Sequence, residues 1–308
     1  MKKFFALLIA ALVLVTAPVH AEISTVKTAD NAADIAGESA EKFYATLPKA
    51  KGDYKSRVRP ILLEGAMNTE TEIFVRALKN PVVYKDLNYL FVAGTYKNYP
   101  VVVVRTEQGM ANAASSTALA IKKFNPIAVI NQGTAGGQDP ALKIGDIVIG
   151  TKSIPFLAIK TAHSPKGAGA DLTNQEIRGT YAYDVASGKF QPYKEYFSDT
   201  TLFNIAFKVA NTHKNFNAVS GIIASSDAWL NTIDYIYFLH EKYGTTCEEM
   251  ETAAAAQICQ NADIPFIGIR VLSDNVTNND KYIPESATIV QDFVLLVVEN
   301  YIHDILKK

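Results

Sequence analysis

Blocks of apolar and polar residues alternate along most of the chain with two different periods. Short runs rich in β-branched residues are typical of buried strands, and runs with apolar residues three and four positions apart are typical of helices. Residues 100–106 are mostly valine, as expected for a strand buried on both faces. Strands are predicted at 60–63, 89–95, 100–106, 127–131, 146–153, 217–224 and 266–272, and helices at 70–78, 111–123, 202–212, 235–242, 251–260 and 289–306.

This alternation predicts an α/β fold in which helices cover both faces of a sheet. Residues 58–308 show no linker or internal repeat and are expected to form one domain. Residues 22–57 are polar and rich in Ala and Lys, and we expect an N-terminal extension with an amphipathic helix at 32–47. Residues 154–200 show no clear period, and a long insertion of this kind is usually functional or mobile.

The first 21 residues have the pattern of a secretory signal peptide. Lys2 and Lys3 precede an apolar run at 4–15 that is too short to span a bilayer, and residues 19–21, Val-His-Ala, offer a small-x-small cleavage site. The protein is therefore expected to be exported, to the periplasm or beyond, with cleavage after Ala21. An uncleaved membrane anchor is the alternative. No membrane association is expected once the peptide is removed.

Composition narrows the class of protein. The 308 residues are 48% hydrophobic and 20% charged, which is an ordinary globular balance. The formal net charge is −1 without a long basic run, so no nucleic-acid partner is expected. The five His and two Cys show no metal-ligand spacing, so no metal is expected either. Cys247 and Cys259 would lie too far apart along a helix for a disulfide, and two buried free thiols are predicted.

Candidate chemistry lies in four short segments that follow predicted strands, where ligands bind in α/β sheets. Residues 65–70 (Gly-Ala-Met-Asn-Thr-Glu) place Glu70 in the first turn of a helix, where a carboxylate also favours the helix dipole by itself. Residues 131–137 (Asn-Gln-Gly-Thr-Ala-Gly-Gly) put three glycines in an expected strand-to-loop turn, which would expose backbone N–H groups to a ligand oxygen.

The other two segments carry charges next to apolar sequence. Residues 248–251 (Glu-Glu-Met-Glu) place three acids at an expected strand-to-helix junction, which is costly if they are buried together. A solvated acidic loop is the alternative. Arg270 lies inside an otherwise apolar strand and needs a buried anionic partner. Asp274 follows that strand, where a proton donor or acceptor would meet a ligand.

Together and in this order, the four segments resemble the nucleoside phosphorylase superfamily, and above all its hydrolase branch, the 5′-methylthioadenosine/S-adenosylhomocysteine nucleosidases. The resemblance runs from Pro60 to the C terminus and is interrupted by residues 154–200. It implies a three-layer α/β/α fold with a mixed central β-sheet and a purine nucleoside as substrate. It also implies that no cofactor is needed and that the protein forms a homodimer or a higher homo-oligomer.

The resemblance further implies roles for three carboxyl groups. Asp274 matches the acid that protonates the imidazole ring of the departing purine, with Ser273 orienting it. Glu70 matches the residue that holds and polarises the attacking water, beside Thr134. Glu251 matches the carboxylate that binds the ribose hydroxyls.

Other residues match substrate-binding positions of the family. Met67 and Met250 match methionines that pack against the sugar, and Arg270 matches an arginine near the attacking water. Trp229 matches an aromatic residue that stacks on the base, although a single tryptophan is also a common core residue. The remaining residues expected to bind substrate lie in the matched segments, and they are Gly136, Leu230 and Glu249.

The residue at position 131 favours water over phosphate as the nucleophile. Phosphorylases of this superfamily carry an arginine where this chain has Asn131, and Glu70 would repel phosphate, whereas Arg270 keeps phosphate possible. The sequence thus favours hydrolysis of the N-glycosidic bond of purine nucleosides. A phosphate-dependent purine nucleoside phosphorylase is the alternative.

Asp274 must be protonated to donate, so burial is expected to raise its pKa. An aspartate at this position also suits a 6-aminopurine such as adenine. The 5′ substituent stays open, because its candidate contacts, His163, Tyr181 and Tyr183, lie in the insertion. An exported nucleoside-binding or storage protein without turnover is the rival from another class. The three acids that the chemistry needs are all present, which argues against it.

Overall fold

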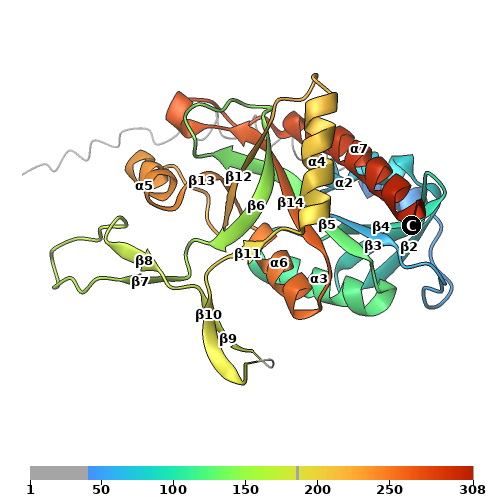
Figure 1. Ribbon diagram of the computed structural model, residues 1–308, viewed down its shortest axis with the longest axis horizontal. Helices are drawn as coiled ribbons and strands as arrows, with labels where there is room; N and C mark the ends of the chain where they lie inside the picture. The colour runs from blue at the N-terminus through green and yellow to red at the C-terminus, as the bar shows by residue number, and fades with distance from the viewer. Residues whose placement is uncertain (1–40, 185–186, 308) are drawn as a thin grey trace, which may run out of the picture.

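A mixed ten-stranded sheet runs through the molecule (Figure 1). The structure, a computed structural model, describes residues 41–184 and 187–307. The strands of the sheet are β1 (Ile61–Gly65), β2 (Lys79–Asp86), β3 (Tyr89–Tyr96), β4 (Tyr99–Arg105), β5 (Ala128–Gly137), β6 (Ile147–Pro155), β11 (Tyr196–Phe197), β12 (Ala218–Ser225), β13 (Thr245–Glu249) and β14 (Phe266–Asp274). Their order is β11-β6-β12-β13-β5-β1-β4-β3-β2, and β14 pairs with both β5 and β6.

Helices cover both faces of this sheet, which confirms the predicted three-layer α/β/α arrangement. They are α2 (Asn68–Ala77), α3 (Met110–Phe124), α4 (Thr200–Thr212), α5 (Ile233–Tyr243), α6 (Thr252–Asn261) and α7 (Ala287–Leu306), with short 3-10 turns at Val276–Asn278 and Pro284–Ser286. Helices α2, α4 and α7 pack on one face, and α3 and α6 pack on the other. Each face therefore has its own apolar core.

Alternate residues of the central strands enter these two cores. In β1, Ile61 and Leu63 face α2, α4 and α7, whereas Leu62 faces α3 and α6. The four valines at 101–104 in β4 alternate between the two cores in the same way. A strand buried on both faces has to be apolar throughout, and this confirms the interpretation of the valine-rich run.

Five strands of the sheet close into a ring. β5 pairs with β14, β14 with β6, β6 with β12, β12 with β13, and β13 returns to β5. Strands β1, β4, β3 and β2 extend outward from β5. In the ring, Gly136 of β5 is paired with Glu248 of β13 on one side and with Asp274 of β14 on the other. The ring thereby brings together three of the four segments identified in the sequence.

Residues 154–200 form antiparallel hairpins. β7 (Ile159–Thr161) pairs with β8 (Gln175–Ile177), and β9 (Thr180–Asp184) pairs with β10 (Lys189–Tyr193). Both hairpins project from the body of the molecule (Figure 1). These strands are three to five residues long, and all but β8 are mostly exposed, so they leave no hydrophobic period that the sequence pattern could reveal.

The N-terminal extension follows the outer strand of the sheet. The predicted signal peptide at 1–21 and most of the predicted helix at 32–47 lie outside the described residues. Residues 41–46 are helical, and Lys49 forms a β-bridge with Val83 of β2. Within the part of the chain that the structure describes, no helix is both long enough and apolar enough to cross a membrane.

Three strands differ from the prediction. The strand at 127–131 does not end in a glycine turn, because β5 continues to Gly137. β2 was not predicted, because it contains Pro81 and is only half-buried. A strand was expected before the acids of 248–251 but without bounds, and β13 includes Glu248 and Glu249 inside a fully buried strand. Cys247 and Cys259 are buried and free, as predicted.

Candidate active site

Glu70 is buried at the start of α2 and is held by four hydrogen bonds. One carboxylate oxygen accepts from the backbone N–H of Ala66 at 2.8 Å and from that of Met67 at 3.2 Å. The other accepts from the backbone N–H of Thr134 at 2.8 Å and from its hydroxyl at 3.0 Å. Glu70 therefore caps its own helix and also bridges to β5, beside the position where a ligand would contact Thr134.

Gly133 is required because Glu70 fills the space beside it. A Cβ on Gly133 would lie 2.7 Å from Glu70 Oε1, and a Cβ on Gly136 would lie 3.0 Å from Glu248 Oε1. The glycines of this segment thus allow side chains of neighbouring elements to approach the strand closely. They do not form the turn that the sequence suggested.

Glu251 immediately precedes α6 and is also buried. Its Oε1 accepts from the backbone N–H of Gly109 at 2.9 Å, and its Oε2 lies 3.9 Å from Nη2 of Arg270. Burial raises the pKa of the Glu251 carboxyl, and the neighbouring Glu249 carboxylate raises it further. A ligand that brings positive charge or hydroxyl donors would therefore stabilise the ionised form of Glu251.

Asp274 is the last residue of β14 and is buried. Burial raises the pKa of its carboxyl, and the Ser273 hydroxyl, which donates to Asp274 at 3.0 Å, partly offsets this rise. The direction is the one expected for a proton donor. The Ser273 hydroxyl also lies 3.2 Å from the Ala135 carbonyl oxygen, so it is placed between β5 and Asp274.

Arg270 has the buried anionic partner that its place in an apolar strand requires. Glu249 accepts from Nε of Arg270 at 3.1 Å and also from Nη2. Nη2 donates to Asn131 Oδ1 at 2.6 Å, and Asn131 donates to Glu64 at 3.1 Å. Burial opposes ionisation of Glu249, but the Arg270 guanidinium and the hydrogen bonds from Ser225, Arg270 and Thr252 together lower the pKa of that carboxyl.

The oxygens of Glu249 are all engaged within the protein. Its carboxylate also accepts from the Ser225 hydroxyl and from the backbone N–H groups of Glu251, at 3.0 Å, and Thr252, at 2.9 Å. Glu249 thus positions Glu251 and the start of α6 instead of offering oxygens to a ligand. Because the Arg270 guanidinium is paired in the same network, it is not free to bind a phosphate.

Trp229 and Tyr282 lie in two different loops, and their rings contact each other. The Trp229 side chain is 61% exposed and packs edge-on against the Tyr282 ring, with 5.4 Å between centroids. The Tyr282 hydroxyl is hydrogen-bonded to the Thr134 side chain. Trp229 is therefore not a core residue. Tyr282 was missed because it lies in an irregular segment after Asp274 with no motif around it.

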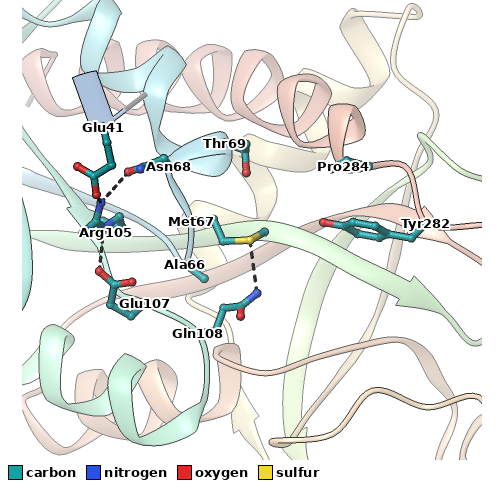
Figure 2. A pocket seen from close by; sticks show the side chains of 10 residues that line it. All are labelled: Glu41, Ala66, Met67, Asn68, Thr69, Arg105, Glu107, Gln108, Tyr282 and Pro284. Carbon is teal, nitrogen blue, oxygen red and sulfur yellow. Dashed lines mark hydrogen bonds and ion pairs between the residues drawn. The ribbon is translucent and has the colours of Figure 1, made fainter. Parts of the chain in front are cut away.

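A cavity of about 370 Å³ opens beside Tyr282 (Figure 2). Met67 and Gln108 line it, with the Met67 sulfur 3.4 Å from the Gln108 amide nitrogen. Arg105 lines it as well and pairs with Glu41 at 2.5 Å. The cavity thus offers a thioether at one side and a paired charge at the other to a group attached to the ligand.

The remaining sequence candidates are less closely tied to the carboxylates. Met250 and Leu230 are half-buried at the ends of the segments that carry Glu251 and Trp229. His163, Tyr181 and Tyr183 are exposed on the projecting hairpins and their loops, and the structure does not bring them to the site. Because these hairpins point away from the body, the cavity is lined by other segments, of which Met67 was indicated by the sequence and Gln108 and Tyr282 were not (Figure 1).

Comparison with known proteins agrees with this geometry. Residues 60–303 match the family model of the phosphorylase superfamily. A 5′-methylthioadenosine/S-adenosylhomocysteine nucleosidase of Geobacillus sp. (strain WCH70) is 30% identical over 78% of this chain and 98% of its own length. A crystal structure of a nucleosidase of the same name from Colwellia psychrerythraea, in complex with adenine, is 26% identical, with a TM-score of 0.63 over 80% of this chain and 97% of that one.

A further solved structure shares the fold. Futalosine hydrolase of Helicobacter pylori is 21% identical, with a TM-score of 0.64 over 79% of this chain and 99% of its own. The match to the family model covers the whole ring of strands and the carboxyl groups of Glu70, Glu251 and Asp274. This chain therefore belongs to the phosphorylase superfamily.

Proposed function

We propose that this protein hydrolyses the N-glycosidic bond of purine nucleosides and releases the free base and the ribose moiety. The observation that carries the proposal is the arrangement of Glu70, Glu251 and Asp274. All three carboxyl groups are buried at the strand and helix ends gathered around β5, while the one cation of their network is paired with Glu249. The proteins to which this chain is similar are named nucleosidases, which means enzymes that hydrolyse nucleosides.

The three carboxyl groups divide the reaction between them. Breaking the bond leaves negative charge on the base and positive charge on the ribose. Asp274, whose pKa is raised by burial, donates its proton to the imidazole ring of the base. Glu251 binds the ribose hydroxyls and, when ionised, stabilises the positive sugar, as a carboxylate does in glycoside hydrolysis. Glu70, fixed by Thr134, holds the attacking water.

Water is the nucleophile that this site favours. A phosphate dianion needs donors and cations of its own, and it is repelled by a carboxylate. Glu70 faces Thr134, Asn131 is neutral and bonded to Glu64 and Arg270, and the guanidinium of Arg270 is held by Glu249. These residues therefore offer no unpaired positive charge for the phosphate that phosphorolysis would require.

The substrate that we expect is an adenine nucleoside with a 5′ substituent. The similar proteins are named for 5′-methylthioadenosine and S-adenosylhomocysteine, and one was solved with adenine. In this chain Trp229 stacks on the base, Met67 and Met250 pack against the sugar, and the cavity beside Tyr282 takes the 5′ group. The pattern of residues 1–21 supports an exported enzyme that acts on external nucleosides.

A direct assay tests the proposal. Residues 22–308 are incubated with adenosine, inosine and 5′-methylthioadenosine, with and without phosphate, and the products are separated by chromatography. We expect free base and free ribose moiety in the absence of phosphate. A sugar 1-phosphate that forms only when phosphate is present would show that the reaction is phosphorolysis and not hydrolysis. Binding without any product would instead favour a storage protein.

Gly133→Ala is expected to lower kcat by about 10- to 100-fold, because a Cβ at that position displaces the Glu70 carboxylate from Thr134. The added methyl also destabilises the fold, by about 1–3 kcal/mol. Gly94→Ala is the matched control, since its Cβ would lie 2.9 Å from the Lys79 carbonyl oxygen, away from the site. Steady-state kinetics and thermal unfolding decide the outcome. Equal kcat in the two variants would contradict the role of Glu70.

A further inference from the structure

Glu248 lies beside Asp274, and the mechanism does not yet use it. It is a buried residue of β13, opposite Gly136 of β5, and Asp274 is paired with the same glycine from β14. A Cβ on Gly136 would lie 3.0 Å from Glu248 Oε1 and 3.5 Å from Asp274 Oδ2. The two carboxyl groups therefore face the same small area, which is open because residue 136 has no side chain.

The hydrogen bonding of Glu248 is incomplete within the protein. Among the described residues, its carboxyl accepts one hydrogen bond, from the backbone N–H of Leu230 at 3.2 Å. Glu249, the next residue in the strand, accepts from Ser225, Arg270 and two backbone N–H groups. A buried carboxyl with so few partners is costly, so a ligand that supplies another bond is bound more tightly.

The place of Glu248 indicates which part of a ligand it meets. In a purine, the imidazole nitrogen that Asp274 would protonate lies next to the substituent at position 6. A second carboxyl beside Asp274 is therefore positioned for the six-membered ring. A ring edge with an acceptor next to a donor can accept the Leu230 N–H in exchange for its 3.2 Å bond to Glu248, and can donate to the Glu248 carboxyl in its place.

We propose that Glu248, with the Leu230 N–H, recognises the six-membered ring of the base and selects purines that carry an N–H donor at position 6. This inference rests on the proposed function of the site. The amidine edge of a 6-aminopurine qualifies, because its 6-amino group donates to Glu248 and its N1 accepts from the Leu230 N–H, whereas the lactam edge of a 6-oxopurine carries donor and acceptor in the opposite order. Purine riboside, which has only acceptors there, makes one hydrogen bond fewer whether Glu248 is ionised or protonated.

The chain as exported, residues 22–308, tests this with two nucleosides and two free bases. The wild type is expected to hydrolyse adenosine with a kcat/KM about tenfold above that for purine riboside, the effect of one hydrogen bond. Calorimetry is expected to show a similar preference for adenine over purine. If no nucleoside is hydrolysed but adenine is still preferred, the proposed function fails and the role of Glu248 stands. Equal binding of adenine and purine by the wild type overturns the role.

Variants of Glu248 separate recognition from folding. Glu248→Leu is expected to abolish the preference for adenosine over purine riboside, mainly by losing activity on adenosine. Glu248→Gln keeps a donor and an acceptor and is expected to retain most of this preference. Glu241→Gln, an exposed carboxyl on α5, is the matched control and is expected to leave the preference unchanged. An unchanged ratio of adenosine to purine riboside in Glu248→Leu would overturn the proposal. If that variant does not fold, the calorimetric comparison of adenine with purine in the wild type decides whether the proposal stands.

Discussion

Replacing Asp274 by Asn is expected to lower kcat by about 10²- to 10⁴-fold, the contribution of a positioned general acid. The amide keeps the shape of the side chain and its place at the end of β14, but it has no proton of suitable acidity to give to the base. Steady-state hydrolysis of adenosine measures the effect. Asp292→Asn, an exposed aspartate on α7, is the matched control and is expected to leave kcat unchanged.

The pH dependence gives this prediction a second readout. Asp274 acts in its protonated form, and burial raises the pKa at which that form is lost. The contribution of Asp274 should therefore be complete below that pKa and be lost as the pH rises through it, whereas the need for ionised Glu251 limits the rate on the acid side. In Asp274→Asn this alkaline decline should disappear. A variant that keeps the wild-type rate and the wild-type alkaline decline would show that another group protonates the base.

Glu249→Ala is expected to destabilise the protein by about 3–5 kcal/mol, because it leaves the Arg270 guanidinium buried without its carboxylate. It also removes the acceptor for the backbone N–H groups of Glu251 and Thr252 at the start of α6. Urea unfolding followed by circular dichroism measures the loss. Among the ion pairs of the described residues, this one joins two fully buried side chains, which is why its effect should be large.

Two further variants test whether the cost comes from the unpaired charge. A double variant, Glu249→Leu with Arg270→Met, removes both charges and is expected to recover much of the stability, since apolar replacements of buried pairs are often neutral. Glu72→Ala breaks the exposed pair with Arg76 and is expected to cost less than about 1 kcal/mol. A double variant as unstable as the single one would mean that the lost cap, and not the charge, dominates.

Much of the fold could be predicted because its central strands are buried on both faces. Such strands have to be apolar at every position, as the valines of β4 are, so the sequence marks them plainly. β2 was not visible for the opposite reason. It lies at the end of the sheet, half its positions need no apolar residue, and Pro81 is tolerated there. The hairpins of residues 154–200 were not predicted for the same reason, since their short strands carry no apolar pattern.

The sequence proposes the residue types of the candidate site but not the contacts between them. Asp274, Glu251 and Glu70 could be identified because each follows a strand or begins a helix in a recognisable segment. Glu249 and Arg270 could not be assigned to each other, because their pairing depends on a ring of strands that returns to β5. Sequence spacing carries no information on such a closure. The glycines of β5 were misjudged because the side chains that crowd them come from other elements.

The outer strand β2 bears on how copies of this protein could associate. A sheet end with free backbone N–H and C=O groups invites a strand of another chain to add to it, and natural proteins discourage this with lysine, proline or a covering segment. β2 has all three: Lys79 and Lys85, Pro81, and residues 48–50, which bond to Val83. At the opposite end, β11 is two residues long. Assembly through a continuous intermolecular sheet is therefore disfavoured, and subunit contacts are left to helices, hairpins and loops.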